Sequence, residues 1–181
     1  MFVRGAILWL TGLSGSGKST LARAVGERAQ AVRPVEILDG DEMRTGLSAD
    51  LGYSKEDRDA NIRRIGLLAC RLARDGALAI VATISPYADA RAGIRRLAER
   101  DGTPFVLTFL DASLPVLIAR DPRGLYRRAL AGDIPHFTGV SDPYERPVDP
   151  DLIVNTDNAS VAASTNRILE ALILRGLLPR E

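Results

Sequence analysis

At 181 residues, the chain has the usual length of one compact domain, which buries roughly 70% of the surface that its unfolded form exposes. Its composition of 46% hydrophobic and 26% charged residues excludes collagen-like, low-complexity and wholly disordered chains. With a net charge of +1, the chain has no bulk attraction for a nucleic acid polymer or an anionic membrane surface, so any anion must be bound locally.

The cysteine content and the apolar runs predict where the protein works. A single cysteine, Cys70, and a single histidine, His136, cannot form an internal disulfide or an ordinary zinc site, which indicates a reducing compartment. The first apolar run, 6–10, is too short for a signal peptide or a membrane span. The leucine-rich stretch 168–178 carries charged residues, which favours an amphipathic helix packed on a core. The sequence therefore predicts a cytoplasmic protein without a membrane partner.

Short apolar runs alternate along the chain with longer segments of helical period. The apolar runs have no polar face, as expected for strands of a parallel sheet that helices cover on both sides. The predicted strands are 6–11, 35–38, 77–83, 105–110 and 152–154, and the predicted helices are 18–31, 55–74, 88–100 and 161–174. The sequence therefore predicts a single α/β domain over residues 1–181, with three layers and a mostly parallel sheet flanked by helices.

The segment 121–150 breaks this alternation. It holds five of the ten prolines, and no strand or helix is predicted within it. Connections of this length in a compact domain are usually functional lids, and the alternative is a loosely ordered surface insertion. A closing lid would exclude water, and Arg120, Arg123, Arg127 and Arg128 could neutralise charge that develops during a reaction. The sequence predicts a mobile lid at about 121–150.

The first chemical motif follows the first predicted strand. Residues 12–19 read GLSGSGKS and match the phosphate-binding pattern GxxxxGK[ST] at every fixed position. Glycines let successive backbone N–H groups face one anion, and the following helix adds its positive N-terminal dipole. Lys18 is expected to bridge the β- and γ-phosphates of ATP, and Ser19 to offer its hydroxyl to Mg²⁺. The motif predicts a P-loop kinase fold whose ATP-binding residues are Gly12, Leu13, Ser14, Gly15, Ser16, Gly17, Lys18, Ser19 and Thr20.

Two carboxylates follow the second predicted strand, in the sequence Asp39-Gly40-Asp41. They lie at the carboxyl edge of a parallel sheet, where open α/β folds bind ligands. Phosphoryl transfer to a hydroxyl needs one carboxylate near the proton of the acceptor and another near Mg²⁺. We therefore expect Asp41 to be the general base and Asp39 to lie in the shell of the metal. In an alternative interpretation, Asp41 caps a helix that begins at Glu42.

Arginines gather after this turn, at positions 44, 58, 63 and 64, together with Tyr53 and Asn61. On a helix, Arg58 and Asn61 are three residues apart and share a face, so both could point into one cleft. Guanidinium groups suit phosphate and sulfate oxygens, and the ring of Tyr53 offers a surface on which a base can stack. The sequence predicts an anionic acceptor, with a nucleotide as the hypothesis.

Together, these residues resemble the adenylylsulfate (APS) kinases, which phosphorylate the 3′-hydroxyl of adenosine 5′-phosphosulfate with MgATP. The resemblance spans nearly the whole chain and rests on several motifs besides the phosphate loop. Glu42, Tyr53, Thr83 and Arg123 depart from residues common in the family, but no departure removes a group that the chemistry needs. The motifs are LDGD at 38–41 with Arg44, LGYS at 51–54, Arg58 with NIRR at 61–64, ISPY at 84–87, DPRGLY at 121–126, FTG at 137–139 and DPYE at 142–145.

The resemblance implies a role for most of these residues. In that family, an aromatic ring at the position of Tyr53 stacks on the adenine of APS, and the position of Ser85 is commonly assigned as a phosphoserine intermediate. Direct in-line transfer from ATP explains the same set of residues without a covalent step. The resemblance also implies a homodimer and a functional link to ATP sulfurylase. The implied catalytic residues are Lys18, Asp41 and Ser85, and Arg120 is implied to bind ATP in addition to the phosphate loop. Ser19 and Asp39 are the implied metal contacts. The implied substrate-binding residues are Asp41, Arg44, Tyr53, Arg58, Asn61, Ile84, Ser85, Arg123 and Phe137.

Two other functions stay open. One is a P-loop kinase of another small hydroxylated acceptor, such as a sugar acid or an antibiotic. The other is a non-catalytic regulatory module that binds APS or its 3′-phosphorylated product, PAPS. The intact phosphate loop disfavours the second function because a sensor has little need of Lys18 and Ser19. The sequence therefore predicts an enzyme that transfers the γ-phosphoryl group of MgATP to APS in sulfate activation.

Overall fold

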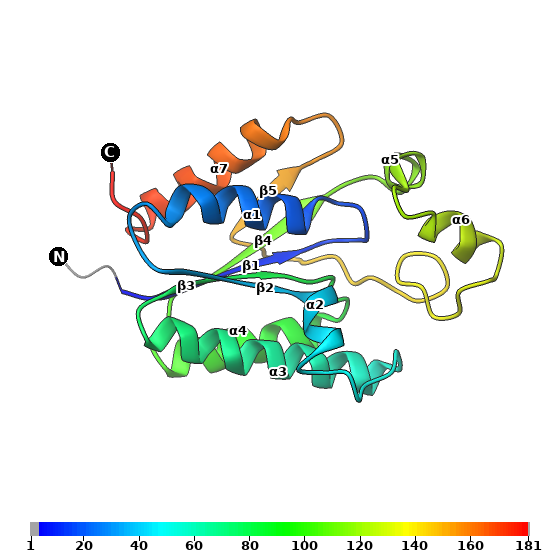
Figure 1. Ribbon diagram of the computed structural model, residues 1–181, viewed down its shortest axis with the longest axis horizontal. Helices are drawn as coiled ribbons and strands as arrows, with labels where there is room; N and C mark the ends of the chain where they lie inside the picture. The colour runs from blue at the N-terminus through cyan, green and yellow to red at the C-terminus, as the bar shows by residue number, and fades with distance from the viewer. Residues whose placement is uncertain (1–3, 181) are drawn as a thin grey trace.

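Five parallel strands form the centre of the protein, in a computed structural model that describes residues 4–180 (Figure 1). Each pair of neighbouring strands runs in the same direction. All five predicted strands are observed, with ends that differ from the prediction by no more than one residue. In sheet order, the strands are β2 (Val35–Asp39), β3 (Leu78–Ala82), β1 (Ala6–Thr11), β4 (Phe105–Asp111) and β5 (Leu152–Asn155).

Helices cover both faces of the sheet (Figure 1). On one face lie α1 (Lys18–Ala29) and α7 (Val161–Leu174), and on the other lie α3 (Lys55–Arg74) and α4 (Ala88–Arg100). These are the predicted helices, except that α1 ends at Ala29 and not at the predicted Ala31. The predicted three-layer α/β architecture is therefore confirmed.

Strand β1 supplies side chains to both hydrophobic layers, because successive residues of a strand point to opposite faces. Leu8 and Leu10 pack with α1 and α7, whereas Trp9 packs with α3 and α4. The Trp9 ring is fully buried and its centroid lies 5.8 Å from that of Phe105. Cys70 is buried in the same layer, where burial raises the pKa of its thiol. The prediction that Cys70 is a packing residue is therefore confirmed.

Short helices stand near the carboxyl ends of the strands, and only the first of them was anticipated, as the helix in the alternative interpretation of Asp41. Helices of six or seven residues make only about two turns, too few for a clear periodic signal. The last of them lies within 121–150, so the prediction that this segment has no secondary structure is wrong. Its start is held by the carboxylate of Asp121, which accepts hydrogen bonds from the backbone N–H groups of Tyr126 and Arg127. These helices are α2 (Gly40–Thr45), α5 (Leu114–Arg120) and α6 (Leu125–Leu130).

The apolar C-terminal stretch belongs to the core. Ile168, Leu169 and Leu172 of α7 are buried against the sheet, and Leu177 and Leu178 continue the same layer beyond the end of the helix. This placement confirms the predicted amphipathic helix. Over residues 4–180, no helix is both long enough and apolar enough to cross a membrane.

Candidate active site

The phosphate loop runs from the end of β1 to the start of α1. Gly12, Gly15 and Gly17 have φ angles of 154°, 78° and 95°, and a Cβ on Gly12 would lie 2.7 Å from the carbonyl oxygen of Leu110. Glycine is therefore needed for the backbone conformation of this loop and for the close approach of β4. The loop borders a cavity of about 390 Å³. Of the predicted loop residues, Ser14, Gly15, Gly17, Lys18, Ser19 and Thr20 line this cavity, and Gly12, Leu13 and Ser16 form the rest of the turn.

Lys18 lies inside this turn. Its Nζ donates hydrogen bonds to the carbonyl oxygens of Gly12 at 3.0 Å and Leu13 at 2.8 Å. Burial lowers the pKa of Lys18 from 10.5 to about 8, and the negative charges of Asp41 and Asp39 offset part of that effect. The surrounding residues thus only partly stabilise the positive charge of the ammonium group, which suits a residue that binds a phosphate group.

The two carboxylates after β2 have different surroundings. The Asp39 side chain is buried, and its Oδ1 accepts the backbone N–H of Asp41 at 3.0 Å. Asp39 is therefore the N-cap of α2, and the alternative interpretation of Asp41 as the cap is wrong. The Asp41 side chain is 74% exposed, and its Oδ2 accepts a hydrogen bond from Arg123 at 2.8 Å. Both residues line the cavity, but Asp41 is the one whose carboxylate is accessible.

Ser19 and Asp39 are the residues predicted to contact magnesium, and both line the cavity. Within residues 4–180, no group of three His, Cys, Asp or Glu side chains could hold a metal by itself. Magnesium in a kinase site needs only about one or two protein oxygens, because phosphates and waters complete its shell. A hydroxyl and a carboxylate fit this donor set, since the cap bond uses Oδ1 of Asp39 and leaves Oδ2 for the metal or its water.

All the predicted acceptor residues except Phe137 line the same cavity. The guanidinium of Arg44 lies 4.5 Å from the centroid of the exposed Tyr53 ring and donates to the carbonyl of Gly52 at 2.8 Å. Asn61 is buried on α3, and its Oδ1 has no hydrogen-bond partner among residues 4–180. A buried amide oxygen without a partner is costly unless a ligand satisfies it. The prediction that Arg58 and Asn61 point into one cleft is confirmed.

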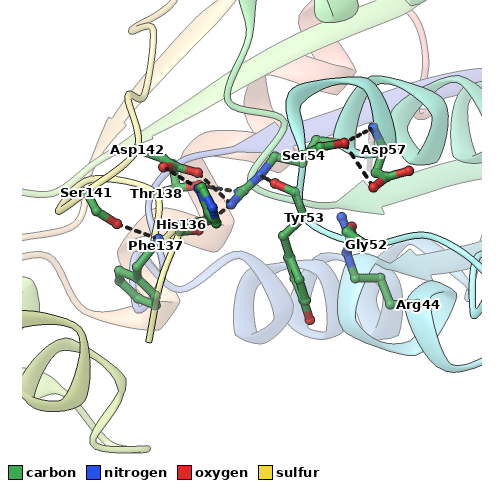
Figure 2. A network of polar contacts seen from close by, with 11 residues as sticks. Arg44, Gly52, Tyr53, Ser54, Asp57, His136, Phe137, Thr138, Ser141 and Asp142 are labelled. Atoms are coloured by element: carbon green, nitrogen blue, oxygen red, sulfur yellow. Dashed lines mark hydrogen bonds and ion pairs between the residues drawn. The ribbon is translucent and has the colours of Figure 1, made fainter. Parts of the chain in front are cut away.

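Arg58 is enclosed by residues of the predicted lid. Its Nε donates to the carbonyl of Tyr53 at 2.8 Å, while its Nη atoms reach the hydroxyl of Thr138 at 2.5 Å and the carboxylate of Asp142 at 3.1 Å. In Figure 2, the carbonyl group of Tyr53 lies on one side of this network and the lid residues lie on the other. Most N–H groups of Arg58 therefore bind the protein itself. We call this arrangement the Arg58 clamp, because it fastens α3 to the segment 136–142.

Aromatic side chains connect the lid to the phosphate loop. The rings of Phe137 and Tyr126 meet edge to face with centroids 5.2 Å apart, and the Tyr126 hydroxyl donates to the carbonyl of Ser14 at 2.8 Å. Phe137 lies beside the cavity and not in its wall. In Figure 2 the rings of Phe137 and Tyr53 extend to the same side of the polar network. The Phe137 ring thus packs against Tyr126, which itself lines the cavity.

The loop after β3 carries Ile84 and Ser85, which both line the cavity. Ser85 has a φ of 41°, which is uncommon for a residue other than glycine. Its buried hydroxyl accepts a hydrogen bond from the indole N–H of Trp9 at 3.1 Å and donates one to the hydroxyl of Thr11 at 3.0 Å. The hydroxyl is therefore engaged in both directions, and neither partner is a base that could activate a nucleophile.

Two predicted lid arginines lie in different places. Arg123 lines the cavity and forms the ion pair with Asp41. Arg120, at the end of α5, donates to the carbonyl oxygens of Thr156 at 2.5 Å and Asp157 at 2.7 Å, and it is not part of the cavity wall. Arg120 thus holds the loop that follows β5, and its contact with ATP stays a prediction.

Sequence reasoning missed several side chains that organise this site. Arg91, Thr138, Asp142 and Tyr144 each hydrogen-bond to groups between 6 and 133 positions away. Most of these contacts join segments that have no common period, so helical or strand patterns cannot reveal them. The FTG motif at 137–139 and the DPYE motif at 142–145, which take part in the family resemblance, contain three of them, but no role was predicted for these three residues.

A parallel sheet, a glycine-rich loop that leads into a helix, a buried lysine and paired carboxylates define a P-loop phosphotransferase. The model of one family, adenylylsulphate kinase, matches residues 4–155. The chain belongs to this adenylylsulphate kinase family.

Individual relatives agree with this membership. The chain is 58% identical over 174 residues to an adenylyl-sulfate kinase of Myxococcus xanthus (strain DK1622), a match that covers 96% of this chain and 94% of the relative. It is 49% identical over 178 residues to the probable bifunctional SAT/APS kinase 2 of Sorangium cellulosum (strain So ce56), covering 97% of this chain and 30% of the relative. The solved structure of the Mycobacterium tuberculosis APS kinase CysC in complex with AMPPNP and APS is 42% identical, with a TM-score of 0.89 and coverage of 93% of this chain and 98% of that one.

Proposed function

We propose that this protein transfers the γ-phosphoryl group of ATP to the 3′-hydroxyl of APS, which gives PAPS for sulfate assimilation. Its membership of the adenylylsulphate kinase family carries this conclusion. The cavity supports it, because one wall is a phosphate loop and another holds Tyr53, Asn61 and Arg44. A sugar-acid kinase would have no evident use for an exposed aromatic ring beside an unpaired buried amide and an arginine.

The phosphate loop is the proposed ATP site. Its backbone N–H groups and the start of α1 favour anions. Lys18 would exchange its hydrogen bonds to the carbonyls of Gly12 and Leu13 for bonds to phosphate oxygens. The negative charge of the phosphates would stabilise the ammonium group, which burial has removed from water. Ser19 and Asp39 are the proposed contacts of magnesium. When bound, magnesium neutralises charge on the phosphates and holds them in place for transfer.

The acceptor nucleotide is proposed to bind beside Tyr53. This ring and the lid ring of Phe137 offer stacking surfaces for a base, and Oδ1 of Asn61 accepts a hydrogen bond from the ligand. Arg44, which lies over the Tyr53 ring, is the proposed partner of the phosphosulfate oxygens. Arg58 contributes mainly by holding the lid, since most of its donors are already used.

Asp41 is the proposed general base. Of the two carboxylates, it is the accessible one and the one that does not cap a helix, so it can reach the proton of a bound hydroxyl. Its ion pair with Arg123 must shift when the acceptor arrives. Because the hydroxyl of Ser85 is buried and engaged, we propose direct in-line transfer from ATP, in which Ser85 and Ile84 shape the acceptor site.

The proposed reaction is tested by the release of ADP from MgATP, measured with APS, without an acceptor, and with a panel of sugars and nucleosides. APS-dependent ADP and a product phosphorylated at the 3′ position are the expected results. Binding of APS without release of ADP would favour the regulatory module. Turnover with another acceptor alone would favour a different P-loop kinase.

Two variants test the proposed roles within the site. Lys18→Ala should abolish transfer, because the β- and γ-phosphates lose their charge partner. Asp41→Asn should lower kcat more than it weakens either nucleotide, and an equal loss in both would indicate a binding role. Lys55→Ala is the matched control, since Lys55 is the other lysine of the chain, is half-exposed and does not line the cavity. Its rates should stay within about twofold of the wild type.

The wider organisation also remains a proposal. We propose one kinase domain over residues 1–181, with a lid at about 121–150 and a homodimer as the working unit, which the mass in solution would test. The Sorangium relative, in which SAT and APS kinase share one name, supports a functional link with an ATP sulfurylase. The cytoplasmic location expected from the sequence stays a prediction.

A further inference from the structure

Arg91 is a buried guanidinium near the start of α4 that the reaction proposed above does not use. The residue is 3% exposed and is not part of the cavity wall. Its Nη1 donates to the carbonyl of Ser85 at 2.5 Å, and its Nη2 donates to the carbonyl of Glu145 at 2.6 Å. Arg91 therefore joins two segments that are distant in the chain. We call residues 84–87 the acceptor loop and residues 142–146 the strap.

Further hydrogen bonds link the acceptor loop, the strap and β1. The hydroxyl of Thr11 donates to the carbonyl of Ile84 at 2.7 Å and accepts from the hydroxyl of Ser85 at 3.0 Å. Since Thr11 has only one proton to donate, its 3.0 Å contact with Tyr144 must run from the tyrosine to Thr11. Burial raises the pKa of Tyr144 to about 12, so this hydroxyl keeps its proton at neutral pH.

The acceptor loop depends on this support because of its backbone conformation. The φ of 41° places Ser85 in a left-handed region that residues other than glycine adopt only when their surroundings hold them there. Arg91 bonds to the carbonyl of this same residue, so it fixes the orientation of the peptide that leads into Pro86. Because Ile84, Ser85 and Pro86 line the cavity, a change in this peptide moves the cavity wall.

We propose that Arg91 is a positioning residue for the acceptor nucleotide, which holds the acceptor loop against the strap so that this wall is formed before APS binds. The inference rests on the proposed function, because that function places the acceptor at this wall. The planar fork of a guanidinium can donate to two carbonyl groups at once, which an ammonium group does less well. The carboxylate of Glu145 accepts the backbone N–H of Ala88 at 2.6 Å, so Arg91 acts on backbone geometry and not through an ion pair.

Steady-state kinetics of the full-length protein test this role. Arg91→Met keeps the length and the apolar part of the side chain but removes every donor. We expect KM for APS to rise by about tenfold, the equivalent of about 1.4 kcal/mol, while KM for ATP changes by less than about twofold. Arg91→Lys should give an intermediate KM for APS, because one of the two carbonyls can still be reached. Equilibrium binding of APS in the absence of ATP should weaken by the same factor.

Arg95→Met is the matched control on the same helix. Arg95 is also partly buried and pairs with Asp151 at 2.5 Å, but it bonds to neither the acceptor loop nor the strap. This variant can lose stability, yet its KM for APS should stay unchanged. The proposal is overturned if Arg91→Met leaves KM for APS unchanged, if KM rises equally for both substrates, or if Arg95→Met has the same effect.

A milder variant covers the case in which Arg91→Met does not fold. Tyr144→Phe removes one hydroxyl and its bond to Thr11, so it loosens the same junction from the strap side. It should raise KM for APS in the same direction by a smaller factor, and an unchanged value would count against the proposal. The wild-type protein in the same assay separates the proposed function from the proposed role of Arg91. If the wild type shows no APS-dependent turnover, the proposed function is refuted and the role of Arg91 is not.

Discussion

The ion pair in the Arg58 clamp allows a direct test of how the lid shapes the acceptor site. The Arg58 and Asp142 side chains are 9% and 16% exposed, and their charged groups are 3.1 Å apart. The substitution Asp142→Asn keeps the size of the side chain and removes the charge that faces Arg58. We expect weaker binding of APS, because the segment 136–142, which carries Phe137, is then held less firmly.

The burial of the pair sets the size of the effect. Removing one partner of a buried pair costs about 3–5 kcal/mol, because the remaining charge stays buried. Here the new amide can still accept a hydrogen bond, and Arg58 keeps Tyr53 and Thr138 as partners. We therefore expect about 2 kcal/mol, a typical value for a hydrogen bond to a charged group. If this cost falls on APS binding alone, about 30-fold is the upper bound for the rise in KM, and we expect about tenfold.

The assay compares KM for APS with KM for ATP in Asp142→Asn and in a control, Asp101→Asn. Asp101 also pairs with an arginine, Arg74, at 3.8 Å, but the two side chains are 29% and 59% exposed and neither lines the cavity. A pair this exposed contributes about 0–1 kcal/mol, so the control should leave both KM values within about twofold. A rise of less than twofold for Asp142→Asn, or an equal rise for ATP, would refute the view that the clamp prepares the acceptor site.

Two further predictions concern pH and packing. Since the pKa of Lys18 is about 8 and only its charged form binds phosphate well, kcat/KM for ATP should be highest below pH 8 and fall as pH rises through that value. A profile that stays flat to pH 9.5 or so would show that Lys18 is not the titrating group that matters. Gly66→Ala should destabilise the fold by about 1–3 kcal/mol in thermal unfolding, because its Cβ would lie 2.4 Å from Ile94 between α3 and α4. The control Gly93→Ala, whose Cβ meets only the end of a flexible arginine at 3.9 Å, should instead stabilise the protein by about 0.5–1 kcal/mol, and a gain for both variants would contradict the packing argument.

The strands and the long helices could be predicted because their signals are local. The strand 6–11 is apolar throughout and is buried along its whole length, and the helix 55–74 carries its buried residues at helical spacing. The phosphate loop is equally local, since its turn depends on glycines a few positions apart. For these parts, the tertiary structure only adds contacts to a conformation that the local sequence already favours.

The sequence alone did not predict which of several nearby polar residues has a structural role and which is free to bind a ligand. Asp39 and Asp41 are two positions apart and chemically identical, and only the start of α2 decides which one is buried as the cap. Arg58 was predicted to bind the substrate, yet its donors turn to acceptors 80 and 84 residues further along the chain. Such pairings depend on the path by which the segment 136–142 comes back to α3, and no periodic sequence pattern predicts that path.

The contacts of the predicted lid also connect the proposed ATP site with the proposed APS site. The lid reaches the phosphate loop through Tyr126, the proposed base through Arg123, and the acceptor residues through Arg58. Phe137 packs edge to face on Tyr126, so the lid ring is connected to the phosphate loop through Tyr126. Arg123 pairs with Asp41 in this arrangement, but both side chains are largely exposed, so the pair opens easily and Asp41 stays accessible. We therefore expect the predicted lid to favour transfer to the bound hydroxyl over transfer to water, because its closure would exclude water from the cavity.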